Sequence, residues 1–393
     1  MASPSQQPDQ DPTIHLTAFS GMKNTVSRET LTPDELEAAI NIDIDDKGKL
    51  HRRRGQTLVS SGTFHSLFNA DDWTLIGVKN GTLGVINPDY SFQPIAYMIG
   101  DQTISGGALT LPDPTAPPFE DTNPIVYRQV GSTIYFTSAT NSGKIDTRSW
   151  TATSWGPDQD IWLSPVVNPT PTLTQVRGKR LGKPPLATSI AYYNGRLYLG
   201  SGRTVWATEL FLYDYVDKTR TFWQFEGDIT MIGDVADGVY VGTTEGVWFL
   251  SGPTFAEMKR VRVLDSAVIP GSMVFIPAEL ANPPQIGTQA DTPLEVSLGF
   301  MTINGFCVAE DGGKTYNLTE SKFRFPTAQR AAALYRVQDG VNQYIVVSDS
   351  EGTPVNNARI GDFVDGEIVK GNNLWPVTSD RVMFRDTFIA DVV

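Results

Sequence analysis

Two stretches of the chain repeat one pattern of turn, strand, glycine and second strand, offset by 42 positions. The first reads Asn194-Gly195-Arg196-Leu197-Tyr198-Leu199-Gly200 and then Val205-Trp206; the second reads Asp237-Gly238-Val239-Tyr240-Val241-Gly242 and then Val247-Trp248. Asn-Gly and Asp-Gly favour two-residue hairpin turns, because both central residues must tolerate positive φ. A repeat of about 40 to 50 residues built from antiparallel strands is typical of β-propeller blades. The repeat therefore predicts neighbouring blades, with Trp206 and Trp248 in equivalent, largely buried positions.

Three further segments carry weaker versions of this hairpin pattern. They are Lys79–Val85, Val130–Phe136 and Ile303–Val308. The intervals between them are irregular, so insertions must interrupt the blades. A β-sandwich or barrel rich in Asn-Gly hairpins is the alternative architecture.

Composition agrees with an all-β chain that contains little helix. The 393 residues include 35 Gly and 26 Pro. The best helical segment is Thr32–Ile40, with Thr32 as the N-cap, Pro33 at the first helical position and Glu35 three residues after the cap. The sequence thus predicts an all-β, β-propeller-like ring of antiparallel blades with loop insertions and a short N-terminal helix.

Pro and Gly clusters outline the organisation of the chain. Residues 1–12 read as a flexible N-terminal arm, 13–375 as the propeller-like body and 376–393 as a C-terminal segment. Long loops on a rigid scaffold usually carry partner contacts. Three stretches are expected to project from the body in this way: 101–124, 157–185 and 277–293.

Charge and cysteine usage limit the function classes. The net charge is −13, which disfavours bulk binding of nucleic acid, since phosphate contacts need Lys and Arg. The basic segment Lys47–Arg54 is the exception, and it reads first as a solvated or interfacial patch and second as a nucleic-acid contact. The single cysteine, Cys307, reads as a small core residue. Without a signal peptide pattern or an apolar run of about 20 residues, the chain is expected to be soluble, with no membrane insertion, and made in a reducing compartment.

No catalytic pattern is visible in the sequence. The three histidines, His15, His51 and His65, lack metal-binding spacing, and there is no Cys pair for zinc. A nucleophile elbow, a P-loop and a dinucleotide fingerprint are also missing. We therefore expect no enzyme activity, no catalytic, cofactor-binding or metal-binding residues, and no cofactor.

The segment Ala309–Tyr316 resembles the Asp-box of sialidase-type propellers, whose pattern is Ser-x-Asp-x-Gly-x-Thr-Trp. It keeps Asp311, Gly313 and Thr315, has Tyr316 as the aromatic residue and lacks the first Ser. An Asp-box is a structural hairpin in which the Asp caps the turn, the Gly supplies positive φ and the aromatic ring packs below. It supports the propeller prediction and carries no catalysis.

Several segments resemble bacteriophage tail proteins. The opening is similar in Phe19–Asn24, Ala39–Asp45 and the Gly-x-Leu-x-x-Arg-x-Gly turn of Gly48–Gly55. Later similarity lies in Ser189–Tyr198 and in the run from Ile229 through Thr243. These segments are scattered over residues 19 to 345, and the family they are most similar to is the tail tube or nozzle protein of short-tailed phages, although this chain is shorter.

The resemblance implies a structural virion protein of the tail. It would be made in the host cytoplasm and form a homo-oligomeric ring, a hexamer by family resemblance, that continues the DNA channel below the portal and adaptor. Its partners would be adaptor or head–tail proteins, tail fibres or spikes, and genomic DNA passing transiently through the lumen. Two alternatives stay open: a receptor-directed carbohydrate-binding or glycan-cleaving propeller, and a host-type propeller scaffold for protein partners.

Overall fold

The computed structural model describes most of the propeller body and parts of both ends. The described residues are 18–23, 25–36, 42–44, 48–52, 59–70, 74–98, 123–163, 179–277, 296–319, 328–338, 341–350, 363–364 and 367–368. The expected arm at 1–12, the C-terminal segment at 376–393 and most of the three expected insertions lie outside these residues. Among the residues described, no helix is long and apolar enough to cross a membrane.

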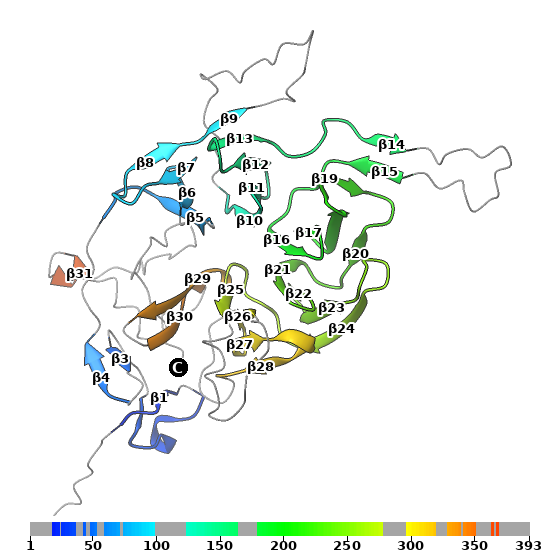
Figure 1. The fold of residues 1–393 in the computed structure, drawn as a ribbon. Helices are drawn as coiled ribbons and strands as arrows, with labels where there is room; N and C mark the ends of the chain where they lie inside the picture. The colour runs from blue at the N-terminus through cyan, green and yellow to red at the C-terminus, as the bar shows by residue number, and fades with distance from the viewer. Residues whose placement is uncertain are drawn as a thin grey trace, which may run out of the picture.

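Five antiparallel blades follow one another along the chain and around a ring (Figure 1). Blade 1 comprises β5 (Phe64–Asn69), β6 (Leu75–Lys79), β7 (Thr82–Ile86) and β8 (Phe92–Pro94). Blade 2 comprises β10 (Val126–Val130), β11 (Thr133–Thr137), β12 (Ser142–Asp146) and β13 (Thr151–Ser154), and β9 (Ala96–Met98) pairs parallel to β13. The predicted β-propeller architecture is confirmed.

The remaining three blades are built in the same way. Blade 3 comprises β16 (Ser189–Tyr193), β17 (Arg196–Ser201), β18 (Thr204–Glu209) and β20 (Phe222–Gln224). Blade 4 comprises β21 (Ile229–Val235), β22 (Gly238–Thr243), β23 (Val247–Ser251) and β24 (Lys259–Leu264). Blade 5 comprises β25 (Val274–Pro277), β26 (Val296–Thr302), β27 (Gly305–Ala309) and β28 (Thr315–Asn317).

Further strands flank the five blades. A long hairpin, β29 (Ala328–Gln338) with β30 (Val341–Ser350), follows blade 5. Near the N-terminus, β1 (Gly21–Met22) pairs parallel to β2 (Glu35–Leu36), and β3 (Ile42–Ile44) pairs antiparallel to β4 (Leu50–Arg52). A two-residue pair, β31 (Phe363–Val364) and β32 (Glu367–Ile368), completes the described strands.

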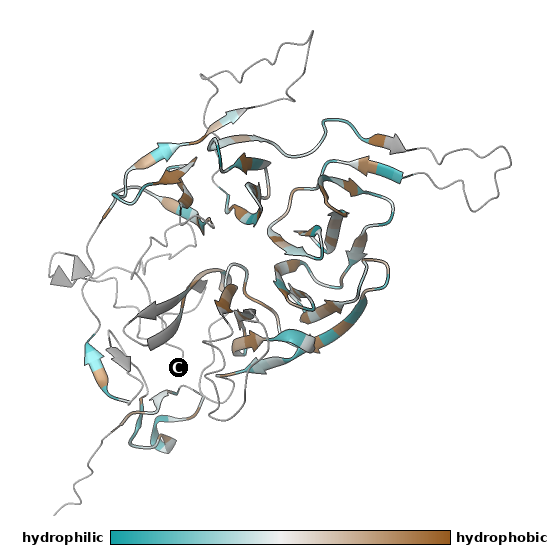
Figure 2. Ribbon diagram, viewed as in Figure 1, coloured by the Kyte–Doolittle hydropathy of each residue, from teal (hydrophilic) through white to brown (hydrophobic). Residues whose placement is uncertain are grey.

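The apolar cores lie between the blades. One cluster joins blades 1 and 2, and others join blades 2 and 3, 3 and 4, and 4 and 5. A fifth cluster joins blade 5 to the β29–β30 hairpin through residues that include Met301, Ala331 and Tyr344. Brown apolar segments accordingly mark the blade strands, whereas β24 at the perimeter mixes hydrophilic and apolar residues (Figure 2). The β29–β30 hairpin therefore packs as the next unit of the ring.

Blade 3 carries a three-stranded extension. Between β18 and β20 the chain forms β19 (Leu212–Asp217), which pairs with β15 (Lys179–Gly182), and β15 pairs with β14 (Ile161–Leu163). β14 and β15 reach outward from the ring (Figure 1). The carboxylate of Asp160 accepts hydrogen bonds from Lys218 at 2.8 Å and from Arg180 at 2.8 Å, and these cations lower its pKa. The described part of the expected 157–185 insertion thus contains the paired strands β14 and β15.

The predicted hairpin turns form at three of the five sites. Asn80-Gly81 and Asn194-Gly195 adopt positive φ at both residues, and Gly131 has positive φ between paired Val130 and Thr133. The other two turns lie one residue earlier than predicted, at Ala236-Asp237 and Ile303-Asn304. The hairpins at Asn80-Gly81 and Ile303-Asn304 join second and third strands, whereas the other three join first and second strands. This difference contributes to the irregular spacing, and the segment with β14 and β15 between blades 2 and 3 adds to it.

The correction at residue 238 has a steric reason. Gly238 already pairs with Val235 in the ladder, so it belongs to the strand. A Cβ placed on Gly238 would lie 2.5 Å from the carbonyl oxygen of Leu250. Glycine is therefore needed there for close strand packing, and the turn is formed by the two residues before it.

The repeat is confirmed in register, and its predicted burial is wrong for the tryptophans. Leu199 pairs with Trp206, and Val241, 42 positions after Leu199, pairs with Trp248. Both tryptophans are only half-buried. At Trp248, arginine side chains lie on the outer side, and the Arg260 guanidinium is 4.9 Å from the ring centroid. Trp206 instead packs against Phe222 at a centroid distance of 5.1 Å. The fully buried aromatic residues of the repeat are instead Tyr198 and Tyr240.

The predicted N-terminal helix is wrong over the residues that the structure describes. The Thr32 amide donates to the Glu35 carboxylate at 3.0 Å, so the capping contact forms as expected. Pro33 and Asp34 then form a turn, and Glu35 and Leu36 enter β2, where they pair with Gly21 and Met22. Sheet pairing overrides the local helical preference. Residues 37–40 lie outside the described residues.

Replacing Gly81 with alanine is expected to lower the free energy of unfolding by about 1–2 kcal/mol, because an L-residue must then adopt left-handed backbone geometry. Gly81 has φ 87°, and a Cβ there would meet no atom within 4 Å. The substitution therefore measures the cost of the left-handed backbone conformation without a steric clash. The control is Gly84→Ala in the same blade, whose Cβ would lie 2.5 Å from the Gln93 carbonyl oxygen; it should cost more. Urea denaturation compares the two, and an unaffected Gly81→Ala protein would contradict the assigned turn.

Candidate functional site

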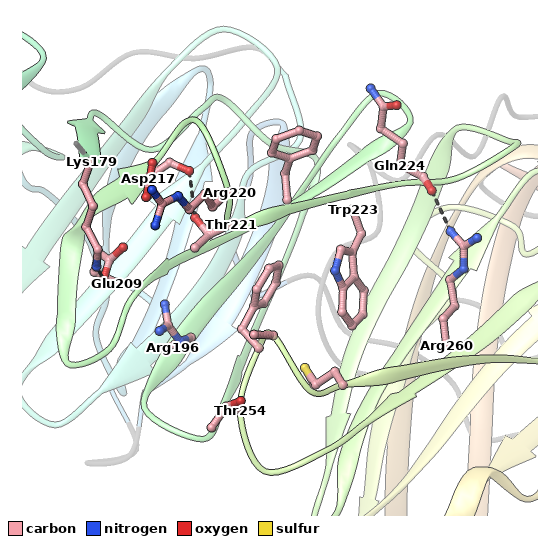
Figure 3. Close-up of a pocket in the computed structure, with 14 residues that line it drawn as sticks. Lys179, Arg196, Glu209, Asp217, Arg220, Thr221, Trp223, Gln224, Thr254 and Arg260 are labelled. Carbon is pink, nitrogen blue, oxygen red and sulfur yellow. Dashed lines mark hydrogen bonds and ion pairs between the residues drawn. The ribbon is translucent and has the colours of Figure 1, made fainter. Parts of the chain in front are cut away.

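An open cleft of about 680 Å³ lies between the outer parts of blades 3 and 4. Its walls come from β15, β17, β18, the β19–β20 segment and the turn between β23 and β24. Figure 3 shows one group of charged residues on one side, Arg260 with Gln224 on the other, and Trp223 between them. The first group consists of Lys179, Arg196, Glu209, Asp217 and Arg220.

Aromatic side chains form part of the cleft wall. Trp223, on β20 opposite Val205, stacks with Phe255 at a centroid distance of 5.1 Å and an interplanar angle of 28°. Both rings are half-buried and pack against the core between blades 3 and 4. Their remaining surface gives the cleft a rigid apolar wall.

The two carboxylates of the cleft are already engaged by the fold. Glu209 is 9% exposed, and its carboxylate lies 3.0 Å from the Lys179 ammonium. Asp217 is 1% exposed and accepts hydrogen bonds from the Thr219 amide at 3.0 Å and the Thr219 hydroxyl at 2.6 Å. Asp217 therefore shapes the turn before β20, and this geometry gives no pair of carboxylates poised for acid–base chemistry.

The cations of the cleft lie closer to solvent than the carboxylates. Arg196 is half-buried and donates through Nη1 to the Thr208 carbonyl, and Arg220 is exposed. Arg260 is also exposed, and it donates to the Gln224 carbonyl at 2.7 Å. Four cationic side chains line the cleft against two buried carboxylates. The cleft is therefore locally cationic in a chain whose net charge is −13.

A second cavity, of about 630 Å³, lies at the centre of the ring. Its lining includes residues at or beside the innermost strands of all five blades and of the β29–β30 hairpin: His65, Val126, Thr188, Ile229, Gly271 and Ala331. Further along these strands, Arg128 on β10 forms an ion pair with Asp234 on β21 at 2.6 Å. The Tyr192 amide donates to the same carboxylate at 3.4 Å, so this contact ties blades 2, 3 and 4 together.

The Asp-box segment links blades 4 and 5. The Asp311 carboxylate accepts from the Ala236 amide at 2.9 Å, and Gly312 donates to the Asp237 carboxylate at 2.9 Å. Gly313 has positive φ, as the Asp-box pattern predicts. The Asp-box pattern also predicts an aromatic ring packed below the turn. That prediction is wrong here, because Tyr316 is 47% exposed.

The other residues singled out in the sequence do not converge on a site. His65 is buried in β5, His51 is exposed in β4, and His15 lies outside the described residues. Cys307 is a buried residue of the core, as predicted. Within the described part of the chain, no three His, Cys, Asp or Glu side chains gather as a metal site.

The described part of the basic segment lies on the β3–β4 hairpin. Lys49, His51 and Arg52 are exposed there. Lys47, Arg53 and Arg54 lie outside the described residues. Within the Gly48–Gly55 segment that resembles the tail-protein turn, Leu50–Arg52 forms strand β4, and residues 53–55 lie outside the described residues.

Sequence patterns did not predict the cleft between blades 3 and 4. Its residues run from Lys179 to Arg260 and come together only because the chain inserts β19 before β20. The nearest sequence signal is the basic run Arg177-Gly178-Lys179-Arg180, which by itself indicates no site. In the fold, Lys179 lines the cleft, whereas Arg180 binds Asp160 of the extension.

No protein-family model and no curated protein matches the chain. Among solved structures, the extracellular domain of the hybrid two-component system BT4673 from B. thetaiotaomicron aligns at 10% identity and a TM-score of 0.40. That alignment covers 74% of this chain and 32% of the other, so this chain spans about a third of its length. The AfRom2 CNH domain aligns at 8% identity and a TM-score of 0.36, covering 74% of this chain and 85% of that domain. Similarity at this level gives no functional assignment.

Proposed function

We propose that the chain is a structural virion protein of a phage tail, a nozzle-type subunit of a ring that continues the DNA channel below the portal and adaptor. The observation that carries this proposal is that charged side chains in the cleft and at the centre of the ring are bound to one another or to turns of the fold. In the cleft, Glu209 and Asp217 are engaged in an ion pair and a turn, and at the centre Arg128 and Asp234 bind each other. Such an arrangement suits a rigid scaffold better than a catalyst.

The tail assignment itself rests on the similar segments near the N-terminus and in blades 3 and 4. Part of the opening motif folds as the β3–β4 hairpin, outside the five blades. Exposed elements of this kind, together with the β14–β15–β19 extension, are available for contacts with neighbouring subunits or adaptor proteins. An excess of carboxylates over cations would also let DNA slide through a shared lumen, since phosphate is repelled.

Electron microscopy of assembled particles tests this proposal. We expect a closed ring on the tail axis, because heterologous contacts that close by rotation give cyclic symmetry. We expect the lumen to be net negative, and the segments 101–124 and 157–185 to contact neighbours. The isolated protein can stay monomeric until the adaptor ring is present, so the particle map is the deciding measurement. A position away from the tail axis, a lumen lined mainly by Lys and Arg, or turnover of host glycans by the pure protein would contradict the proposal.

A further inference from the structure

We propose that the cleft between blades 3 and 4 binds an acidic saccharide. The carboxylate of the sugar would meet the cations at one side of the cleft, and its pyranose ring would lie against the neighbouring aromatic wall. This binding site goes beyond the proposed structural role, and it does not require that the protein occupy a tail.

The charge distribution indicates an anionic ligand. The exposed fraction of the Lys179 side chain is 46%, against 12% for its partner Glu209, so the positive member of the pair faces solvent. Arg196 uses Nη1 for the Thr208 carbonyl, and a guanidinium carries five N–H donors in all. Arg220 is exposed on the same side of the cleft (Figure 3). Guanidinium groups match a carboxylate well, because they can donate two parallel hydrogen bonds.

The aromatic wall indicates a ligand with an apolar face. Trp223 and Phe255 are held by the core between blades 3 and 4, so the wall is formed before any ligand arrives. The C–H groups on one face of a pyranose carry partial positive charge, and the face of an aromatic ring is negative. A sugar ring can therefore pack flat where a bare phosphate would leave the wall without contact.

The size and shape of the cleft fit a short saccharide. Its volume, about 680 Å³, lies in the range of ordinary small-molecule sites. Trp223 and Phe255 stack on each other at 5.1 Å, so a ligand ring would lie against the outer surface of this pair. The net charge of −13 disfavours nucleic acid, so an acidic sugar is the better fit, and an acidic peptide becomes an outcome of the test.

Isothermal titration with defined oligosaccharides tests the proposal. The probes are a galacturonate trisaccharide and sialyllactose, with lactose as the neutral match. We expect the acidic probes to bind, lactose to bind at least about tenfold more weakly, and Arg220→Ala to lose about tenfold in affinity, the effect of one charge-assisted contact. Arg220→Lys should recover part of the loss. The control is Arg148→Ala, which removes an exposed arginine of blade 2 and should change nothing.

Several outcomes would overturn the proposal. They are equal binding of lactose and sialyllactose, unchanged affinity in Arg220→Ala, or tighter binding of an acidic hexapeptide than of either acidic sugar. Trp223→Leu tests the contact between the sugar ring and the aromatic wall. This variant should bind the sugar more weakly, and urea denaturation shows whether it is folded. Particles that carry Arg220→Ala should keep their ring symmetry, so a failed sugar site and a failed tail assignment give different results.

Discussion

Replacing Arg128 with methionine should lower the free energy of unfolding by about 3–5 kcal/mol, because it leaves a buried carboxylate without its counter-charge. Asp234 lies on the inner strand of blade 4, and its side chain is 15% exposed. Its carboxylate forms an ion pair with Arg128 of blade 2 at 2.6 Å, and the Arg128 guanidinium also lies 5.2 Å from the Phe275 ring centroid. Urea denaturation followed by circular dichroism measures the loss.

The double variant Arg128→Met with Asp234→Asn is the control. It removes the uncompensated charge but keeps an acceptor for the Tyr192 amide, so much of the lost stability should return. If the single change costs less than about 1 kcal/mol, the pair behaves as an ordinary surface ion pair and its structural role is wrong.

The pH dependence of this variant follows from the pKa of Asp234. Burial raises the pKa of Asp234 above its ordinary value of 3.8, and Arg128 opposes that shift. A raised folded-state pKa means that the folded protein binds the proton more readily, so this group's contribution to stability falls as pH rises through the window above 3.8. Without Arg128 the shift is larger, and the stability difference from the wild type should shrink as pH falls from 7 towards 4.

Replacing Trp155 with alanine should destabilise the fold by about 3–5 kcal/mol, since it deletes a large buried side chain. Trp155 is 0% exposed and packs 5.1 Å from the Tyr135 ring centroid. Its Nε1 donates to the Tyr213 carbonyl at 2.9 Å, which connects the end of blade 2 to β19 of the extension.

Trp206→Ala is the matched control for this prediction. Trp206 is only half-buried, so the same chemical change removes less apolar surface from the interior. Equilibrium unfolding should therefore rank Trp155→Ala well below Trp206→Ala in stability. Equal losses at the two sites would contradict the assignment of Trp155 as an anchor of the extension.

The repeat predicted the blades because its information is local. A turn at Asn194-Gly195 and a paired strand follow from backbone preference and alternation, and both are present. The helix expected at Thr32–Ile40 was wrong because Glu35 and Leu36 pair with Gly21 and Met22 of β1. The turn expected at Asp237-Gly238 was wrong because Gly238 already pairs within the hairpin and packs closely against Leu250 of the next strand.

The cleft and the place of the β29–β30 hairpin in the ring could not be predicted from the sequence, for a related reason. Lys179, Arg196 and Arg220 carry no shared spacing, and only the insertion of β19 between β18 and β20 brings them together. The β29–β30 hairpin lacks the four-strand pattern of a blade, so its place in the ring is visible only from the core that it shares with blade 5. Tertiary contacts of this kind have no counterpart in a single-sequence pattern.

The cores shared between blades make the seam between two blades the cooperative unit of this fold. Each of these apolar clusters contains residues from two successive blades. A blade that unfolds alone therefore exposes the apolar cluster that it shares with each neighbouring blade. We therefore expect unfolding to spread from seam to seam, as in nearest-neighbour models of repeat proteins. Lengthening a connection outside a seam adds only about 0.6 kcal/mol of closure entropy per doubling. A chain built this way can accept long additions between β9 and β10 or between β14 and β15 while every seam stays intact.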